Sequence, residues 1–517
     1  MKYLFPIFFL FSNSVYAQTE FERYYTFNNW AWISQIFDFP GKGYFAVGYS
    51  DSLVLDSVGN PEIDYLNAVL INIDYNGDTI KTFSYGNSDT AYLQLYGRNS
   101  DDFARNAMKT SDGNIILTGE TQSYNAQNIY DYDLWFIKLT PLLDTLWMKT
   151  FSIPDTAIVT SLVNVSTITN EKGFAVSGAQ RCYGNNCYFQ AHITVFDSLG
   201  NLKFHSRLLP QNHCYLQGIV QTSDNGFIAT GELDNIPYTD ASPLIIKVDS
   251  SGNYQWHIVL PFSGDFNYAE NIIKTLDGNY VFVWENVVTI GSNKLWHYHA
   301  NKIDEQGATL WQKDYVYSFD SHQRVAELPN GNLMVSGIFS DTLGYTTMGY
   351  LMLADSNGDS LWTRKFRGNP TSVIRCIAGN PTSDGGFILG GETYCCNTHP
   401  LFGQTSSMWV IKTDSLGLIL SSNEIGKPIV KDYRLGVPYP NPAIEEISIN
   451  ILTPFTENNT ESILLLFDIS GRQINSYDIS PGINIKKLDV SQLRAGEYLL
   501  ALSVNGYNAG VVKFIKK

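Results

Sequence analysis

The chain alternates short apolar stretches with turns in which Asp or Asn stands beside Gly. The clearest example is 111–120, where the turn Ser-Asp-Gly-Asn precedes Ile-Ile-Leu-Thr and then the pair Gly-Glu. Short apolar stretches bounded by such turns are typical of buried β-strands. Similar phrases end at Gly48, Gly119, Gly178, Gly231, Trp284, Gly337 and Gly391, which makes seven copies.

Each copy continues with a second hairpin, as in 245–252, where Gly252 follows Asp249 after two residues. Asp hydrogen-bonds its own turn backbone and Gly accepts a positive φ, so this spacing predicts a tight turn. An aromatic residue stands seven positions after the Asp position in five copies, at Trp147, Phe204, Trp256, Trp311 and Trp362, whereas Lys81 and Ser421 stand there in the other two. Four short strands per copy, repeated seven times, predict an all-β fold and a seven-bladed β-propeller.

The ring of a propeller has to be closed, and two stretches could supply the closing strand. Residues 20–27, Glu-Phe-Glu-Arg-Tyr-Tyr-Thr-Phe, are similar to the outer strand expected at 361–366. Residues 418–424 follow the last copy directly and compete for the same place. The pattern does not choose between them.

Glutamate and lysine occur together in four of the copies. In these copies Glu follows the apolar strand, and Lys stands two residues before the Asp position of the second hairpin. The pairs are Glu120 with Lys138, Glu232 with Lys247, Glu285 with Lys302 and Glu392 with Lys412. The other copies carry neither residue. Since a single charge in a half-buried strand is costly, this coupling predicts cross-strand Glu–Lys ion pairs. The alternative is a ring of carboxylates that binds a cation.

The pattern changes after Lys427. Tyr439-Pro-Asn-Pro cannot continue a central strand, and Ile447, Ile449 and Ile451 then alternate with polar residues. Further strands are expected at 463–468, 483–488, 497–504 and 511–515. We therefore expect a small C-terminal β-sandwich at 428–517, after a propeller at 18–427.

Charge and hydropathy narrow the protein class. The net charge of −16 argues against a phosphate-binding surface, so nucleic acid is not an expected partner. The N-terminus, with Lys2, the apolar run 3–11, Val15 and Ala17, predicts a signal peptide at 1–17, cleaved between Ala17 and Gln18. No later stretch reaches the roughly 20 apolar residues of a membrane helix, so an integral membrane protein is not expected.

The six cysteines allow disulfides in an exported protein. Cys182 and Cys187 are close enough to staple one loop. Cys395 and Cys396 are adjacent and have Cys376 and Cys214 as possible partners, and the connectivity stays open.

Signatures of catalysis are missing, since the chain has no H-E-x-x-H, G-x-S-x-G or P-loop motif, so an enzyme is not favoured. His297 and His299 would face the same side of a strand, but no third metal ligand is visible, which favours ordinary histidines. The segments 355–359 and 74–78 contain pieces of calcium loops, but ordinary turns are favoured there too. No cofactor is expected, and calcium is the one ion left open.

The variable loops after the Gly-Glu strands are the expected binding surface, because a rigid scaffold frees its loops to vary. Their aromatic residues suit contact with protein or glycan. The candidate residues are Tyr124, Tyr130, Tyr132, Tyr183, Tyr188, Tyr345 and Phe402. The alternative is that these side chains only pack the loops.

The C-terminal segment resembles a known family, the type IX secretion system sorting domain, type A. The resemblance rests on Tyr439-Pro440-Asn441-Pro442, on 467–472 with Gly471 and Arg472, on 488–498 with Gly496 and Tyr498, and on the ending Lys-Phe-Ile-Lys-Lys. It implies the type IX machinery as a partner and export through the periplasm to the cell surface or the medium. In that family the sorting domain is commonly removed during export.

Three functions remain in view. The first is a secreted or surface-attached propeller that binds protein or glycan without catalysis. The second is an extracellular polysaccharide hydrolase or lyase, which carboxylates and a His converging at one mouth of the propeller would favour. The third is a structural or adhesive surface component.

Overall fold

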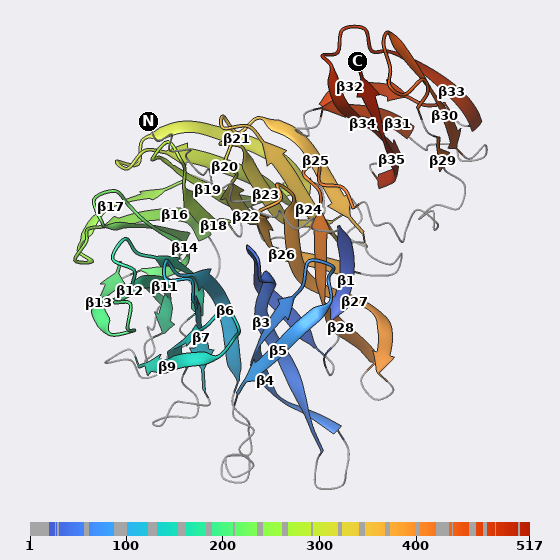
Figure 1. The fold of residues 1–517 in the computed structure, drawn as a ribbon. Coiled ribbons are helices and arrows are strands. Elements are labelled where there is room, and N and C mark those ends of the chain that lie inside the picture. Colours follow the sequence, from blue (N-terminus) through green and yellow to red (C-terminus); the bar gives the residue numbers. More distant parts are fainter. Residues whose placement is uncertain are drawn as a thin grey trace, which may run out of the picture.

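The fold is described from a computed structural model. It covers residues 20–25, 27, 30–55, 61–86, 101–122, 132–152, 162–181, 189–209, 212–234, 241–260, 267–290, 293–318, 323–340, 347–367, 373–399, 403–419, 434–436, 438–453, 462–468, 473–480, 482–504 and 507–517. Within these ranges all regular secondary structure is β-strand, which confirms the predicted all-β class (Figure 1). The same ranges contain no helix that is long and apolar enough to cross a membrane.

Seven four-stranded antiparallel sheets succeed one another along the described part of the chain up to Thr413 (Figure 1). Sheets 1 to 3 are β2 (Ala31–Phe39), β3 (Gly43–Leu55), β4 (Pro61–Ile73), β5 (Thr79–Tyr85); β6 (Asp102–Lys109), β7 (Ile115–Thr121), β8 (Asp133–Leu139), β9 (Thr145–Phe151); and β10 (Leu162–Ile168), β11 (Phe174–Arg181), β12 (Phe189–Phe196), β13 (Leu202–Leu208). Sheets 4 to 6 are β14 (His213–Gln221), β15 (Phe227–Asp234), β16 (Ala241–Val248), β17 (Tyr254–Val259); β18 (Asn267–Lys274), β19 (Tyr280–Ile290), β20 (Asn293–Ile303), β21 (Thr309–Ser318); and β22 (Gln323–Glu327), β23 (Leu333–Ser340), β24 (Thr347–Ala354), β25 (Ser360–Phe366). Sheet 7 is β26 (Val373–Pro381), β27 (Phe387–His399), β28 (Gly403–Thr413) and, from the start of the chain, β1 (Phe21–Tyr25).

Neighbouring sheets meet through their first strands. Each of β2, β6, β10, β14, β18, β22 and β26 contacts the next in this order, and β26 contacts β2. Apolar side chains fill the spaces between sheets, for example Phe45, Ala104 and Trp135 between sheets 1 and 2. The sheets therefore follow one another in a closed order.

Sheet 7 is completed by the N-terminal strand. β1 lies antiparallel to β28, with Phe21 opposite Lys412 and Tyr25 opposite Met408. The Trp409 indole donates a hydrogen bond of 2.8 Å to Glu22 Oε1. Of the two predicted closing stretches, 20–27 takes this place. In the other, Leu418 ends the turn after β28, and residues 420–424 lie outside the described ranges.

The second hairpin of each sheet packs on the last strand of the preceding sheet. A Cβ atom added at the hairpin glycine would approach the aromatic ring of that strand closely, in the pairs Gly200 with Trp147, Gly252 with Phe204, Gly307 with Trp256, Gly358 with Trp311, Gly417 with Trp362 and Gly77 with Phe21. Phe21 of β1 thus supplies the aromatic residue of sheet 7. Sheets 1 and 2 are the exception. The hairpin of sheet 2 has Leu143 in place of the glycine, and β5 of sheet 1 has Lys81 in place of the aromatic residue. Here Lys81 Nζ donates a hydrogen bond of 3.0 Å to the Leu142 carbonyl.

We expect Gly307→Ala to destabilise the protein more than Gly278→Ala. Both glycines have a positive φ, of 87° and 86°, so both substitutions strain the backbone. Only at Gly307 would the new Cβ clash, 2.7 Å from Ile258 Cδ1, whereas nothing lies within 4 Å at Gly278. Urea unfolding should show an additional loss of about 0.5–1 kcal/mol for Gly307→Ala, because the end of the Ile258 side chain and the Trp256 ring at 3.2 Å have to shift. Equal losses would mean that the packing between sheets contributes nothing here.

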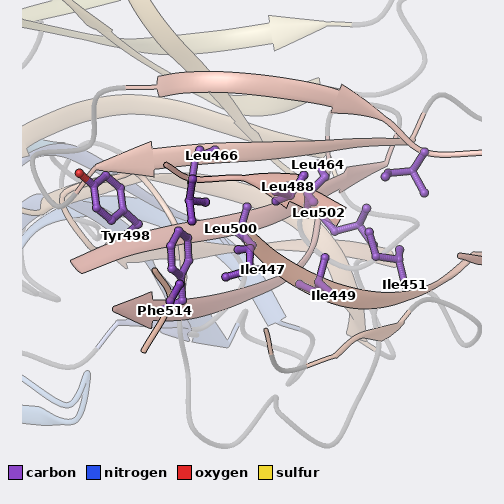
Figure 2. Packing of buried hydrophobic residues seen from close by; sticks show 13 residues of the cluster. Ile447, Ile449, Ile451, Leu464, Leu466, Leu488, Tyr498, Leu500, Leu502 and Phe514 are labelled. Atoms are coloured by element: carbon purple, nitrogen blue, oxygen red, sulfur yellow. The ribbon is translucent and has the colours of Figure 1, made fainter. Parts of the chain in front are cut away.

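The C-terminal part contains two further sheets around one core. One sheet is β29 (Arg434–Leu435), β30 (Glu446–Thr453) and β33 (Gly482–Asp489); the other is β32 (Gln473–Asp478), β31 (Ser462–Asp468), β34 (Gly496–Val504) and β35 (Tyr507–Lys516). Ile447, Ile449 and Ile451 point from β30 toward Leu464, Leu466, Leu500 and Leu502 of the second sheet (Figure 2). The alternation predicted for the three isoleucines is confirmed.

Candidate functional site

The four lysines of the repeat pair with aspartates, and the predicted Glu–Lys ion pairs are wrong. The Lys Nζ to Asp Oδ2 distances are 2.7 Å for Lys138 and Asp112, 2.8 Å for Lys247 and Asp224, 2.6 Å for Lys302 and Asp277, and 2.9 Å for Lys412 and Asp384. Each aspartate lies in the turn between the first two strands of its sheet. A threonine two residues earlier also donates to it, as Thr222 does to Asp224 at 2.5 Å.

Strand register explains why the glutamates are out of reach. In sheet 2, Lys138 lies opposite Ile116 on β7, whereas Glu120 lies opposite Leu134. Four residues along a strand correspond to about 13 Å. The lysines therefore mark the turn end of the sheets, and the glutamates mark the opposite end, where the variable loops emerge.

Three carboxylates at this loop end pair with arginines. Arg105 Nη2 lies 3.3 Å from Glu120, Arg375 Nη1 lies 3.4 Å from Glu392, and Arg324 Nη1 of sheet 6 lies 4.0 Å from Glu270 of sheet 5. The three glutamate side chains are almost fully buried, while the arginines stay partly exposed. Burial of an unpaired carboxylate is costly, so the guanidinium groups stabilise the charges in place.

A β-bulge in the first strand helps to position these charges. The register shifts by one residue in the first strand of sheets 1, 2, 3, 4, 5 and 7, opposite the glycine of the Gly-Glu pair or the residue in its place. Arg105 and Glu270 are the extra residues in sheets 2 and 5. Such a bulge turns one side chain away from the regular alternation.

Aromatic rings join two of the Arg–Glu pairs into one surface across sheets 7, 1 and 2. The Trp30 indole donates to Glu392 Oε2 at 3.1 Å, and its ring centroid lies 6.4 Å from that of Tyr49. Tyr49 in turn stacks on Trp32 and lies beneath the Arg105 guanidinium at 5.8 Å. We call this surface the Trp30 cluster; its members are Trp30, Trp32, Tyr49, Phe103, Arg105, Glu120, Arg375 and Glu392.

The Trp30 cluster presents both flat apolar rings and charged donors to solvent. Trp30 is 38% exposed and the Arg375 side chain 40% exposed, although Glu392 between them is buried. Rings of this kind stack on sugar faces or on side chains, while guanidinium groups donate several hydrogen bonds in a fixed geometry. The arrangement is suited to binding a polar ligand with flat apolar faces.

A second group of polar side chains lies at the loop end of sheet 4. His213 Nδ1 is 2.7 Å from Asp234 Oδ2, and both side chains are buried. Tyr215 lies opposite Glu232 in the same strand pair. Burial, with a smaller effect of Asp234, raises the pKa of Glu232 to about 8, so this carboxyl group keeps its proton at neutral pH.

Of the histidine pair singled out in the sequence, His299 forms ordinary hydrogen bonds. His299 contacts Asp314 Oδ1 at 2.7 Å and Asn286 Oδ1 at 2.6 Å, and its ring stacks on Trp284. Burial lowers the pKa of His299 to about 4. Among the described residues no group of three or more His, Cys, Asp or Glu side chains could hold a metal ion.

The two segments with calcium-like sequences form tight turns. Asp74 Oδ1 accepts from the backbone N–H groups of Asn76 and Asp78, both at 2.8 Å. Asp355 does the same with Asn357 and Asp359, both at 2.9 Å.

Of the predicted binding residues, only Tyr132 lies within the described ranges. Its hydroxyl group donates to Asp101 at 3.5 Å and its ring lies 5.9 Å from Phe103, so it packs its loop against the first strand of sheet 2. Tyr124, Tyr130, Tyr183, Tyr188, Tyr345 and Phe402 lie outside the described residues. The Trp30 cluster was missed by sequence reasoning, although Trp30 and Trp32 alternate at the start of the first repeat.

Other predicted positions can be placed in part. Cys214 is a buried free thiol, which removes it as a disulfide partner. Asn441 lies between Pro440 and Pro442 and accepts from the Ile515 N–H at 2.9 Å, and the Tyr498 hydroxyl donates to the Arg494 carbonyl at 2.8 Å. The cleavage pair Ala17 and Gln18, the remaining side chains of the six cysteines, and Gly471 and Arg472 lie outside the description.

Comparison with known proteins identifies the C-terminal part only. Residues 438–517 match the family model of the secretion system C-terminal sorting domain, and no curated protein matches the chain. Among solved structures, a protein of unknown function from Dyadobacter fermentans aligns at 11% identity and a TM-score of 0.40, over 59% of this chain and 93% of that one. The β-propeller domain of the trilobed protease from Pyrococcus furiosus aligns at 10% and 0.38, over 77% and 100%, and the polysaccharide lyase Uly1 at 8% and 0.41, over 74% and 90%. At these scores the structural similarities carry no argument about activity.

Proposed function

Because residues 438–517 are a type IX secretion sorting domain, the protein is exported to the cell surface or the extracellular space, and we propose that it binds a glycan or a protein there without catalysis. In this proposal residues 1–17 are a cleaved signal peptide, 18–427 form a seven-bladed propeller, and 428–517 form a β-sandwich that serves export. Sheets 1 to 7 are the seven blades, and the loop end is the binding face.

The observation that supports this proposal is the Trp30 cluster. It combines a 38% exposed tryptophan, a half-buried second tryptophan and two arginines that are already paired with buried carboxylates. Trp, Tyr and Arg are the residues that dominate binding energy at protein interfaces. The same aromatic rings would stack on the apolar face of a sugar.

We expect Trp30→Ala to weaken ligand binding at least about tenfold, about 1.4 kcal/mol, because the exposed ring supplies contact area. The measurement is a glycan array and a panel of soluble polysaccharides and extracellular proteins, with the full chain as the probe. Leu142→Ala is the matched control, since Leu142 is 62% exposed at the turn end. Equal binding by the two variants would place the ligand elsewhere, and no binding to any probe would favour a structural or adhesive component.

The second candidate, a polysaccharide hydrolase or lyase, is favoured by the polar group in sheet 4. Glu232 with a raised pKa could donate a proton, and His213 held by Asp234 could accept one. If this candidate holds, polysaccharide chains should shorten, and Glu232→Gln should slow that shortening at least about a hundredfold. Binding without depolymerisation rejects it.

Glu232 also predicts a pH dependence of stability. An unfolded chain releases this proton near the ordinary value of 4.5, but the folded protein keeps it up to about pH 8 because burial raises the pKa. The contribution of this group to stability should therefore fall as the pH rises through that interval. Glu232→Gln should flatten this part of the curve of melting temperature against pH, and an unchanged slope would contradict the assignment.

A further inference from the structure

The second C-terminal sheet has two apolar faces. Leu464, Leu466, Leu500 and Leu502 face the core shared with β30 (Figure 2). Strand alternation turns Leu465, Phe467, Leu499 and Ala501 to the opposite face. A sheet that faced water on this side would carry polar residues there, so its apolar character points to a covering partner.

The covering partner in this structure is the turn that follows β28. Leu416 and Leu418 form one buried cluster with Phe467 and Ala501, and the exposed fractions of these four side chains are 1%, 3%, 0% and 3%. Leu465, Leu499 and Val511 are partly buried around them. β25 of sheet 6 also contacts β35.

A partly buried arginine joins the two parts at the same place. The Arg364 guanidinium lies 4.8 Å from the ring centroid of Trp362 and 5.4 Å from that of Phe467. Burial lowers the pKa of Arg364 to about 10, although Asp414 opposes this. A desolvated guanidinium between two aromatic rings forms a specific cation–π contact.

We propose that this contact docks the sorting domain on the propeller and depends on the intact linker 420–433. We call the contact the clasp; it is formed by Trp362, Arg364, Leu416, Leu418, Phe467 and Ala501. The clasp lies away from the loop end, so the inference is independent of the proposed ligand binding. It assigns the propeller as the partner of the outer sheet face.

The size of the clasp explains the dependence on the linker. Among the described residues, a few side chains on each side form the clasp, and a contact of that extent is smaller than the interfaces of stable complexes. A short linker keeps the two surfaces at an effective concentration of about millimolar, so a weak contact stays closed within one chain. Once the linker is cut, the same contact should open at low micromolar concentration and uncover Leu416 and Leu418.

The experiment uses the full chain with a protease recognition sequence substituted within 420–433. In the intact chain, amide hydrogen exchange at 414–418 should quicken at least about tenfold in Phe467→Ala and in the reciprocal Leu418→Ala. Ile485→Ala is the matched control, because Ile485 is 64% exposed on the other sheet, and it should leave the exchange unchanged. Protection of Leu500 and Leu502 reports whether the sorting domain itself is still folded.

After protease treatment the two fragments should elute separately from a size-exclusion column. Exchange at 414–418 should then match that of intact Phe467→Ala. The inference is overturned if Phe467→Ala exchanges like the control with its core still protected. It is also overturned if the fragments of the unsubstituted clasp remain together at low micromolar concentration.

Discussion

Deletion of β1 is expected to abolish cooperative folding of the seven sheets, and Phe21→Ala alone should lower the free energy of unfolding by about 3–5 kcal/mol. Phe21 is 2% exposed and lies in one apolar cluster with Tyr44, Ile73 and Val410. Its removal leaves a cavity where sheet 7 meets sheet 1. Without β1 the backbone edge of β28 is also left unpaired.

Urea unfolding followed by tryptophan fluorescence measures this effect. Tyr24→Ala is the matched control, because Tyr24 belongs to the same strand but is 41% exposed. It should cost less than about 1 kcal/mol. A loss as small for Phe21→Ala would contradict the role of this side chain in closing the ring, whereas cooperative unfolding of the β1 deletion would show that the ring is stable without its closing strand.

The second large effect is expected for Asp384→Ala, which should lower the free energy of unfolding by about 3–5 kcal/mol. Lys412 is fully buried, and its ammonium group donates to Asp384 at 2.9 Å and to the Thr413 carbonyl at 2.7 Å. Removing the carboxylate leaves a buried cation without its counter-ion. The double variant Asp384→Ala/Lys412→Met, which removes both charges, should recover much of the loss.

Asp112→Ala provides the comparison within the same chain, since Lys138 is more accessible to water than Lys412. Its cost should be smaller, and equal costs would contradict the role of burial.

Acid should act on the same contacts. Burial raises the pKa of Asp224, but hydrogen bonds from Lys247, Thr222 and Gly226 outweigh this and hold the pKa at about 2. The stability from this pair is complete above about pH 4 and is lost as the pH falls toward 2.

The repeat was predictable because its signals are local. An Asp turn, a Gly with positive φ and an apolar strand each follow from a few neighbouring residues, as at Asp249 and Gly252. The contact of Gly307 with Trp256 was not predictable in this way, because it joins two copies. Both residues were recognised, but nothing within one copy indicates that they meet across sheets.

The Glu–Lys error has a similar origin. Lysine does occur together with a carboxylate, but each of the four copies contains two candidate carboxylates. One is the glutamate, and the other is the turn aspartate, which is Asp112, Asp224, Asp277 or Asp384. Co-occurrence indicates that a counter-ion is present without saying which one. Only the strand register separates the two choices, since it places Lys138 four positions away from Glu120.

The candidate binding surface was the least predictable part. Trp30, Tyr49, Arg105 and Glu392 come from three sheets, and Glu392 is more than 300 residues away from Trp30 along the chain. The bulge that adds Arg105 to its strand has no clear mark in the sequence. Loop aromatic residues were the natural expectation, and Tyr132 illustrates how such a residue can instead secure its own loop.

The pairing of β1 with β28 has a consequence for the speed of folding. Phe21 lies opposite Lys412, so the two ends of the seven-sheet part are neighbours in space. A circular permutant that bridges residues 419 and 20 and opens the chain between Tyr85 and Asp102 would build sheet 7 from consecutive strands. Its contact order would be lower, and low contact order favours rapid folding. The natural order of strands makes closure a late event that waits for both ends of the chain.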